Sequence, residues 1–70
     1  MSKKVAIFEY YTGEVIHFAK NEEIAENWIY NEALTYNFGI FRYWEEKDKG
    51  WRVFDVGPKV YAIKSKNFKL

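Results

Sequence analysis

The sequence predicts a small α+β domain in which a β-hairpin and one helix precede a three-stranded antiparallel meander, a ββαβββ order. Three observations predict this class. Two short β-branched and aromatic runs flank a glycine-containing turn, an amphipathic segment follows a good N-cap residue, and three further strand-like runs alternate with turn residues. A helix packed on one face of a mainly antiparallel sheet is an arrangement that buries both elements.

The hairpin is predicted from residues 4–10 and 14–20, which flank the turn residues 11–13. Its register is open, because the two faces of a strand alternate and the loop length decides which residues pair. A two-residue loop places on one face Val5, Ile7, Ile16 and Phe18. A three-residue loop instead groups Ala6, Phe8, Tyr10, Ile16 and Phe18.

The helix is predicted to start after Asn21, which is a good N-cap residue and is followed by two glutamates where the helix dipole favours negative charge. We expect the helix to end near Asn37, with Gly39 as its terminator. At 100° per residue one stripe contains Ala25, Trp28, Ile29, Ala33 and Tyr36.

Two helix residues do not fit a simple amphipathic pattern. Leu34 falls opposite the stripe, where it covers a loop or forms an exposed apolar contact. Glu32 falls within the stripe, so it either reaches past the stripe's edge or pairs with a buried tyrosine or arginine. The edge position is the simpler expectation.

The meander is predicted from residues 40–46, 51–56 and 60–64, joined by residues 47–50 and by a turn around Pro58. A four-residue first loop sets Arg42 opposite Asp55 and Glu45 opposite Arg52, which pairs opposite charges. This register gives a core face beneath the helix of Phe41, Tyr43, Phe54, Val56, Tyr61 and Ile63. The opposite face carries Ile40, Arg42, Trp44, Glu46, Trp51, Val53, Asp55, Val60, Ala62 and Lys64.

Composition indicates one aromatic-rich domain over residues 1–70. At this length only about 60% of the unfolded chain's surface can be buried, so the 21% aromatic content compensates for small size. The chain has no cysteine and so cannot use disulfides, which favours a cytoplasmic location. A net charge of +1 argues against a strongly polyanion-binding protein. We expect no membrane association.

The opening hairpin and helix are similar to those of a β-grasp domain, but the three-strand meander that follows departs from that family. The order also lacks the second helix of the RNA-recognition motif and places its helix earlier than an OB-fold does. The sequence therefore identifies no family whose functional residues could be assigned to positions of this chain.

The helix-free face of the meander is the first candidate for function. Tryptophan and arginine dominate interface hot spots, and the expected partner-binding residues are Arg42, Trp44, Trp51, Val53 and Asp55. The function hypothesis is a protein-binding module that inhibits or modulates a larger protein. In size and general character, the chain resembles the small accessory proteins of bacteriophages and mobile elements. Alternatively, the first hairpin covers this face, or a second copy of the chain covers it in a homodimer.

A single-stranded nucleic-acid-binding domain is the alternative function, with a basic and aromatic C-terminal strand that tracks phosphates and stacks bases. Its residues would be Lys59, Tyr61, Lys64, Lys66 and Phe68. A solvated edge strand with lysines that discourage edge pairing explains the same residues.

Catalysis is not expected. His17 is the single histidine and lies in an apolar strand, where a structural, hydrogen-bonded imidazole is the expected role. The adjacent glutamates 22/23 and 45/46 diverge on a helix or point to opposite faces of a strand, so they form no acid/base pair. With no cysteine, a zinc site is not expected, and no cofactor is implied.

The two adjacent tyrosines of the hairpin turn, Tyr10 and Tyr11, are expected to point in different directions. One ring should pack inward and the other should cover the hairpin.

Overall fold

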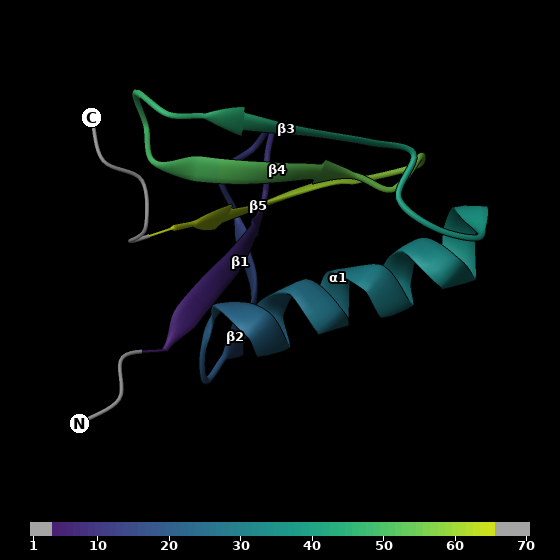
Figure 1. Cartoon of the computed structure of the whole chain (residues 1–70), viewed down its shortest axis with the longest axis horizontal. Coiled ribbons are helices and arrows are strands. Elements are labelled where there is room, and N and C mark those ends of the chain that lie inside the picture. The colour runs from purple at the N-terminus through teal and green to yellow at the C-terminus, as the bar shows by residue number, and fades with distance from the viewer. Residues whose placement is uncertain (1–3, 66–70) are drawn as a thin grey trace.

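The computed structural model describes residues 4–65, which form one five-stranded sheet and one helix (Figure 1). All strand pairs are antiparallel, and the order across the sheet is β2-β1-β5-β4-β3. This confirms the ββαβββ fold class. The elements are β1 Val5–Glu9, β2 Val15–Ala19, α1 Glu22–Asn37, β3 Arg42–Glu46, β4 Trp51–Asp55 and β5 Val60–Lys64.

The last strand, β5, lies in the middle of the sheet and pairs with both β1 and β4. The expectation of a solvated edge strand is therefore wrong. Because β5 is buried on both faces along most of its length, its apolar residues pack on two sides instead of alternating with solvent.

The first hairpin has neither of the two expected loops. Five residues, Tyr10 to Glu14, connect the strands, and the amide of Gly13 donates to the Glu9 carbonyl at 2.8 Å. A bulge in β2 follows the Ile7–His17 pair, so that Phe8 lies opposite Val15. Ala6 lies opposite Phe18, which places Ile7 and Phe18 on different faces of the sheet. The grouping predicted from a two-residue loop is therefore wrong.

The helix begins and ends where the sequence predicts. The Asn21 side chain accepts from the Ile24 amide at 2.9 Å, which caps the first turn. At the other end Phe38, not Gly39, takes the left-handed conformation, with φ +61°. The Gly39 amide then donates to the carbonyl of Ala33 at 3.2 Å. The terminator therefore lies one residue earlier than expected, on an aromatic residue.

The main core lies between α1 and the strands β1, β2 and β5, against which the helix packs. Ala25, Ile29 and Ala33 of the helix are fully buried, as the stripe predicts, whereas Tyr36 is exposed. The predicted meander register is confirmed, with Tyr43 opposite Phe54 and Phe54 opposite Tyr61. Ile40 was expected on the helix-free face, but it packs against this helix-side core. Within residues 4–65 no helix is long and apolar enough to cross a membrane.

Substitution of the central helix residue should test this core. Ile29 is fully buried, whereas Ile24 on the same helix is exposed. Ile29→Ala should lower the free energy of unfolding by about 2–5 kcal/mol, because it removes buried methyl groups and leaves a cavity. Ile24→Ala should change it by less than about 0.5 kcal/mol. Urea denaturation followed by circular dichroism measures both, and equal losses would contradict the packing described.

Candidate interaction surfaces

The helix-free face of the sheet carries a second, smaller apolar cluster. Its buried floor is Val53, Val60 and Ala62, and four aromatic residues pack on it: Phe8, Tyr10, Trp44 and Trp51. The Phe8 and Trp51 rings meet edge to face with centroids 4.9 Å apart, and Tyr10 lies 5.7 Å from Trp44. The first hairpin therefore covers part of the face that the sequence predicts to be open.

Glu46 links the hairpin to the far edge strand. Its Oε2 accepts a short hydrogen bond from the Tyr10 hydroxyl and a 3.0 Å bond from the Trp44 indole N–H. Tyr10 belongs to the hairpin loop, so this contact crosses β5 and β4 to reach the end of β3. The hydrogen bond from Tyr10, followed by that from Trp44, lowers the pKa of Glu46. The same bond raises the pKa of Tyr10.

The five residues predicted to bind a partner lie at very different depths. Val53 is fully buried, and the side chain of Asp55 is 7% exposed. Asp55 accepts from the Arg42 guanidinium at 3.0 and 3.1 Å and from the Gly57 amide at 2.8 Å, so it orders the β3 and β4 ends. Trp44 and Trp51 are half-buried. Arg42 is the most accessible of the set, with its side chain 62% exposed.

The residues of the nucleic-acid alternative are not brought together as a stacking surface. Tyr61 is buried under the helix, and its hydroxyl donates to Glu32 at 3.1 Å. Burial, followed by this hydrogen bond, raises the pKa of Tyr61. Glu32 therefore pairs with a buried tyrosine instead of lying free at the stripe's edge. Lys59 and Lys64 are exposed, and Lys66 and Phe68 lie outside the described residues.

Of the residues considered for catalysis, His17, Glu45 and Glu46 contact other side chains. The His17 ring is stacked on Trp28 with centroids 5.0 Å apart, so a ring contact, not the expected hydrogen bond, holds it. Glu45 and Glu46 serve opposite faces of the sheet, as predicted: Glu45 accepts from Tyr43 on the helix side. Among residues 4–65, no three His, Cys, Asp or Glu side chains are grouped closely enough to hold a metal ion.

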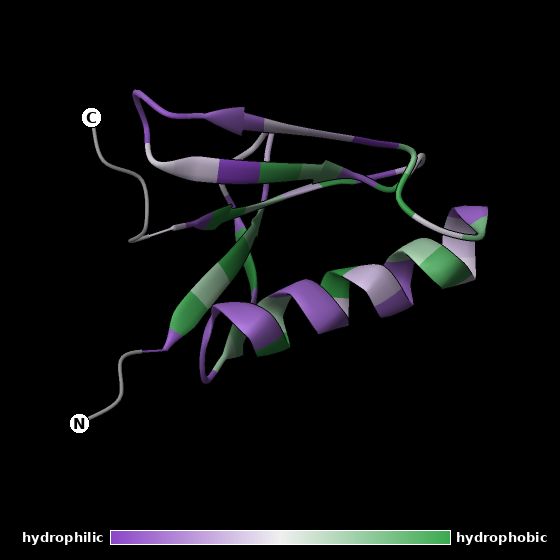
Figure 2. Ribbon diagram, viewed as in Figure 1, coloured by the Kyte–Doolittle hydropathy of each residue, from purple (hydrophilic) through white to green (hydrophobic). Residues whose placement is uncertain are grey.

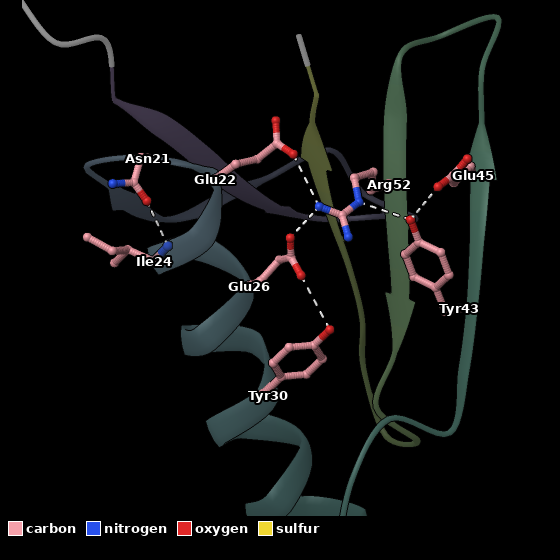
Figure 3. Close-up of polar contacts among 8 residues, drawn as sticks. All are labelled: Asn21, Glu22, Ile24, Glu26, Tyr30, Tyr43, Glu45 and Arg52. Carbon is pink, nitrogen blue, oxygen red and sulfur yellow. Dashed lines mark hydrogen bonds and ion pairs between the residues drawn. The ribbon is translucent and has the colours of Figure 1, made fainter. Parts of the chain in front are cut away.

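Arg52 of β4 connects the helix to β3 (Figure 3). One of its terminal nitrogens donates to Glu22 at 3.1 Å and makes a short bond to Glu26. Its Nε donates to the Tyr43 hydroxyl at 2.9 Å. The sequence predicts the opposition of Arg52 and Glu45, but the contacts with the helix depend on how the layers pack. Glu22, one of the two acidic residues in the first turn of the helix, therefore also forms a tertiary ion pair.

Five exposed apolar residues line the open side of the helix and the neighbouring edge strand. We call them the aromatic ridge: Tyr30, Leu34, Phe38, Phe41 and Tyr43. The rings of Tyr30 and Tyr43 both contact Phe54, at 6.1 and 5.0 Å, which joins the helix part to the strand part. Leu34 follows Tyr30 by four residues, so the two share one side of the helix, and Phe38 is the C-cap residue just beyond the helix end. The connection from α1 to β3 is partly hydrophobic, in contrast to the β3–β4 turn (Figure 2).

Phe38 is the most unusual residue of this ridge. It is 96% exposed and has a positive φ, a conformation that costs a non-glycine residue about 1–2 kcal/mol. Neither packing nor backbone preference therefore explains a phenylalanine at this position. Its role is not evident from the sequence, because glycine, here Gly39, is the more usual helix terminator; the available signal was an apolar residue directly after the predicted helix end.

No family model, curated protein or solved structure matches this chain. The function must therefore be argued from the surfaces just described.

Removal of the Arg52 bridge should loosen the contact between helix and sheet. Arg52→Met leaves Glu22 and Glu26 without their shared cation, and should lower the free energy of unfolding by about 1–2 kcal/mol. Lys49→Met removes the single ion pair of a half-exposed lysine with Glu46 and should cost less, about 0.5 kcal/mol. Urea titrations at low and high salt measure both effects. An Arg52 variant as stable as the Lys49 variant would contradict the role of this bridge.

The pH dependence of stability should reveal the Glu46 network. The native pKa of Glu46 lies below its ordinary value of 4.5, so its ionised form stabilises the fold above about pH 4.5. This contribution is lost as the pH falls through the lowered native pKa. Wild type should therefore be more stable than Glu46→Gln at pH 7, and the difference should shrink in acid. Thermal denaturation from neutral to acid pH tests this, and a pH-independent difference would contradict it.

Proposed function

We propose that this chain is a non-enzymatic protein-binding module that docks on a larger protein through the aromatic ridge, with Arg42 at its margin. The single observation that carries this proposal is Phe38, which is both strained and almost fully exposed. A residue that violates local preference without improving packing is a candidate functional residue.

The ridge has the composition of an interface core. Aromatic side chains are enriched at such sites, where they fill pockets of the partner. Contiguous exposed apolar surface on a small protein commonly marks an interaction site. The rings of Tyr30 and Tyr43 rest on the buried Phe54 ring, so this part of the surface is preorganised, which lowers the entropy lost on binding.

Arg42 supplies the orienting charge. Its guanidinium lies 5.9 Å from the Phe41 ring centroid and is anchored by Asp55, yet most of its side chain remains exposed. Of the residues first predicted to bind a partner, Arg42 thus borders the ridge, while Trp44 and Trp51 form the neighbouring cluster. A rigid domain that inserts an apolar knob into a larger protein acts by occupying a site. We therefore propose inhibition or modulation as its effect, in the manner of bacteriophage accessory proteins.

Affinity capture with ridge variants tests this function. The purified full chain is used as bait in a bacterial lysate, with nuclease present, at low and high salt. Phe38→Ser and Leu34→Ser should each weaken capture of a specific protein about tenfold or more, as expected for hot-spot residues. Tyr11→Ser alters another exposed aromatic residue, on the hairpin loop, and should leave capture unchanged.

Two outcomes would count against the ridge. In the first, the partner is still captured by both ridge variants but is lost with Trp44→Ser or Trp51→Ser. This result would place the binding site on the helix-free face. Recovery of a partner that disappears at high salt or with nuclease would indicate nucleic-acid binding. Circular dichroism of each variant confirms that the fold is retained.

A further inference from the structure

The two edges of the sheet differ in how they are protected. The edge strand β3 carries three charged residues among its five, Arg42, Glu45 and Glu46. Charged side chains on an edge strand oppose pairing with another chain. The other edge strand, β2, reads Val-Ile-His-Phe-Ala and contains no acidic or lysine or arginine residue. Three of its apolar side chains are exposed: Val15, Ile16 and Phe18.

The hydrogen-bond pattern shows which backbone groups of β2 face outward. The Tyr10 amide donates to β5, at Val60, and the Glu9 amide donates to the β2 side, at Glu14. Backbone groups of successive strand residues point to opposite neighbours, so Ile7, like Glu9, bonds toward β2. His17, the partner of Ile7, then points its amide and carbonyl toward β1. Those of the next residue, Phe18, therefore point to the free edge.

Phe18 is also placed for contact with a neighbour through its side chain. It is 56% exposed and lies opposite Ala6, whose small side chain leaves the ring uncovered. The ladder to β1 is regular from His17 to Ala19, with the bulge on the Val15 side. This half of β2 therefore presents a regular edge with an aromatic residue at its middle.

Charges at the two ends of β2 indicate the partner. Glu14 precedes the strand and Lys20 follows it, and neither side chain forms an ion pair within the described part of the chain. A parallel copy of the same strand would place like charges together. An antiparallel copy centred on Phe18 sets Lys20 of one chain opposite Ile16 of the other, so that Glu14, two residues from Ile16, becomes the diagonal neighbour of Lys20.

We propose that this chain forms a two-fold dimer in which the β2 edges pair antiparallel, with Phe18 of one copy opposite Phe18 of the second. The two Phe18 residues exchange both of their backbone hydrogen bonds, and their rings form a cross-strand aromatic pair. The two five-stranded sheets become continuous, and the aromatic ridge remains outside the contact. The arrangement is isologous, as is common for homodimers.

Light scattering over a concentration series tests the dimer with the full chain. Wild type should approach twice the 8.5 kDa of a single chain as concentration rises. Phe18→Lys places two like charges at the two-fold axis and should weaken association at least about tenfold. Phe41→Lys, at an exposed phenylalanine beside the opposite edge, should associate like wild type. A single-chain mass at every concentration, or a dimer unaffected by Phe18→Lys, would overturn the proposal.

A charge swap tests the orientation without altering Phe18. Glu14→Lys and Lys20→Glu should each weaken the dimer, because each sets like charges at diagonal positions across the two strands. The double variant restores opposite charges and should recover most of the association. Failure of the double variant to recover, with both single variants weakened, would contradict antiparallel pairing.

A cysteine cross-link tests the register. The chain has no cysteine, so Phe18→Cys introduces a single thiol at the proposed axis. Directly opposed residues in a hydrogen-bonded antiparallel pair have Cα atoms about 5.5 Å apart, within the disulfide range of roughly 4.4–6.8 Å. Mild oxidation should yield a covalent dimer with Phe18→Cys and little with Phe41→Cys. Equal cross-linking of the two variants would contradict this register.

Discussion

Arg52 is the polar link between the helix and the β3–β4 half of the sheet. The helix packs its apolar stripe mainly on β1, β2 and β5, and Phe54 of β4 and Val56 belong to the same core. Arg52 adds ion pairs to Glu22 and Glu26 while it holds the Tyr43 hydroxyl. Burial disfavours its charge, but the hydrogen bonds to Glu26 and Tyr43 outweigh that effect and raise its pKa. The Tyr30–Phe54–Tyr43 contacts, and with them the ridge, depend on the geometry that this bridge sets.

A second constraint is the small size of the chain, which the fold meets by packing both faces of one sheet. The helix closes one face, and the hairpin aromatics close much of the other. Curling of the sheet allows this, since Tyr10 contacts residues on β3, two strands beyond its neighbour β5. The large apolar side chains that remain exposed lie on the helix, on the connection from α1 to β3, on β3 and on the first hairpin.

The sequence predicts the fold class, the helix limits and the meander register, because each depends on local signals. The opposition of Arg42 to Asp55 and of Glu45 to Arg52 selects the meander register, together with the pairing of aromatic with apolar residues. The hairpin register is not predictable from the sequence, because it depends on a five-residue connection and on a bulge in β2, which together decide the face on which each residue lies. The burial of Val53 and the packing of Tyr10 against Trp44 depend on how the sheet curves. No local sequence pattern predicts that curvature. Phe38 was missed because glycine is the usual left-handed residue at a helix end.

The central position of β5 has a consequence for how the chain acquires its structure during translation. The β1–β2 hairpin and the β3–β4 hairpin have no strand pairing with each other except through β5. As a ribosome extends the chain, both hairpins emerge before the strand that joins them, each with one unpaired inner edge. The sheet is completed only when residues 60–64 insert between them, so this strand makes many contacts distant in sequence. Until then the nascent chain exposes two strand edges that the finished molecule conceals.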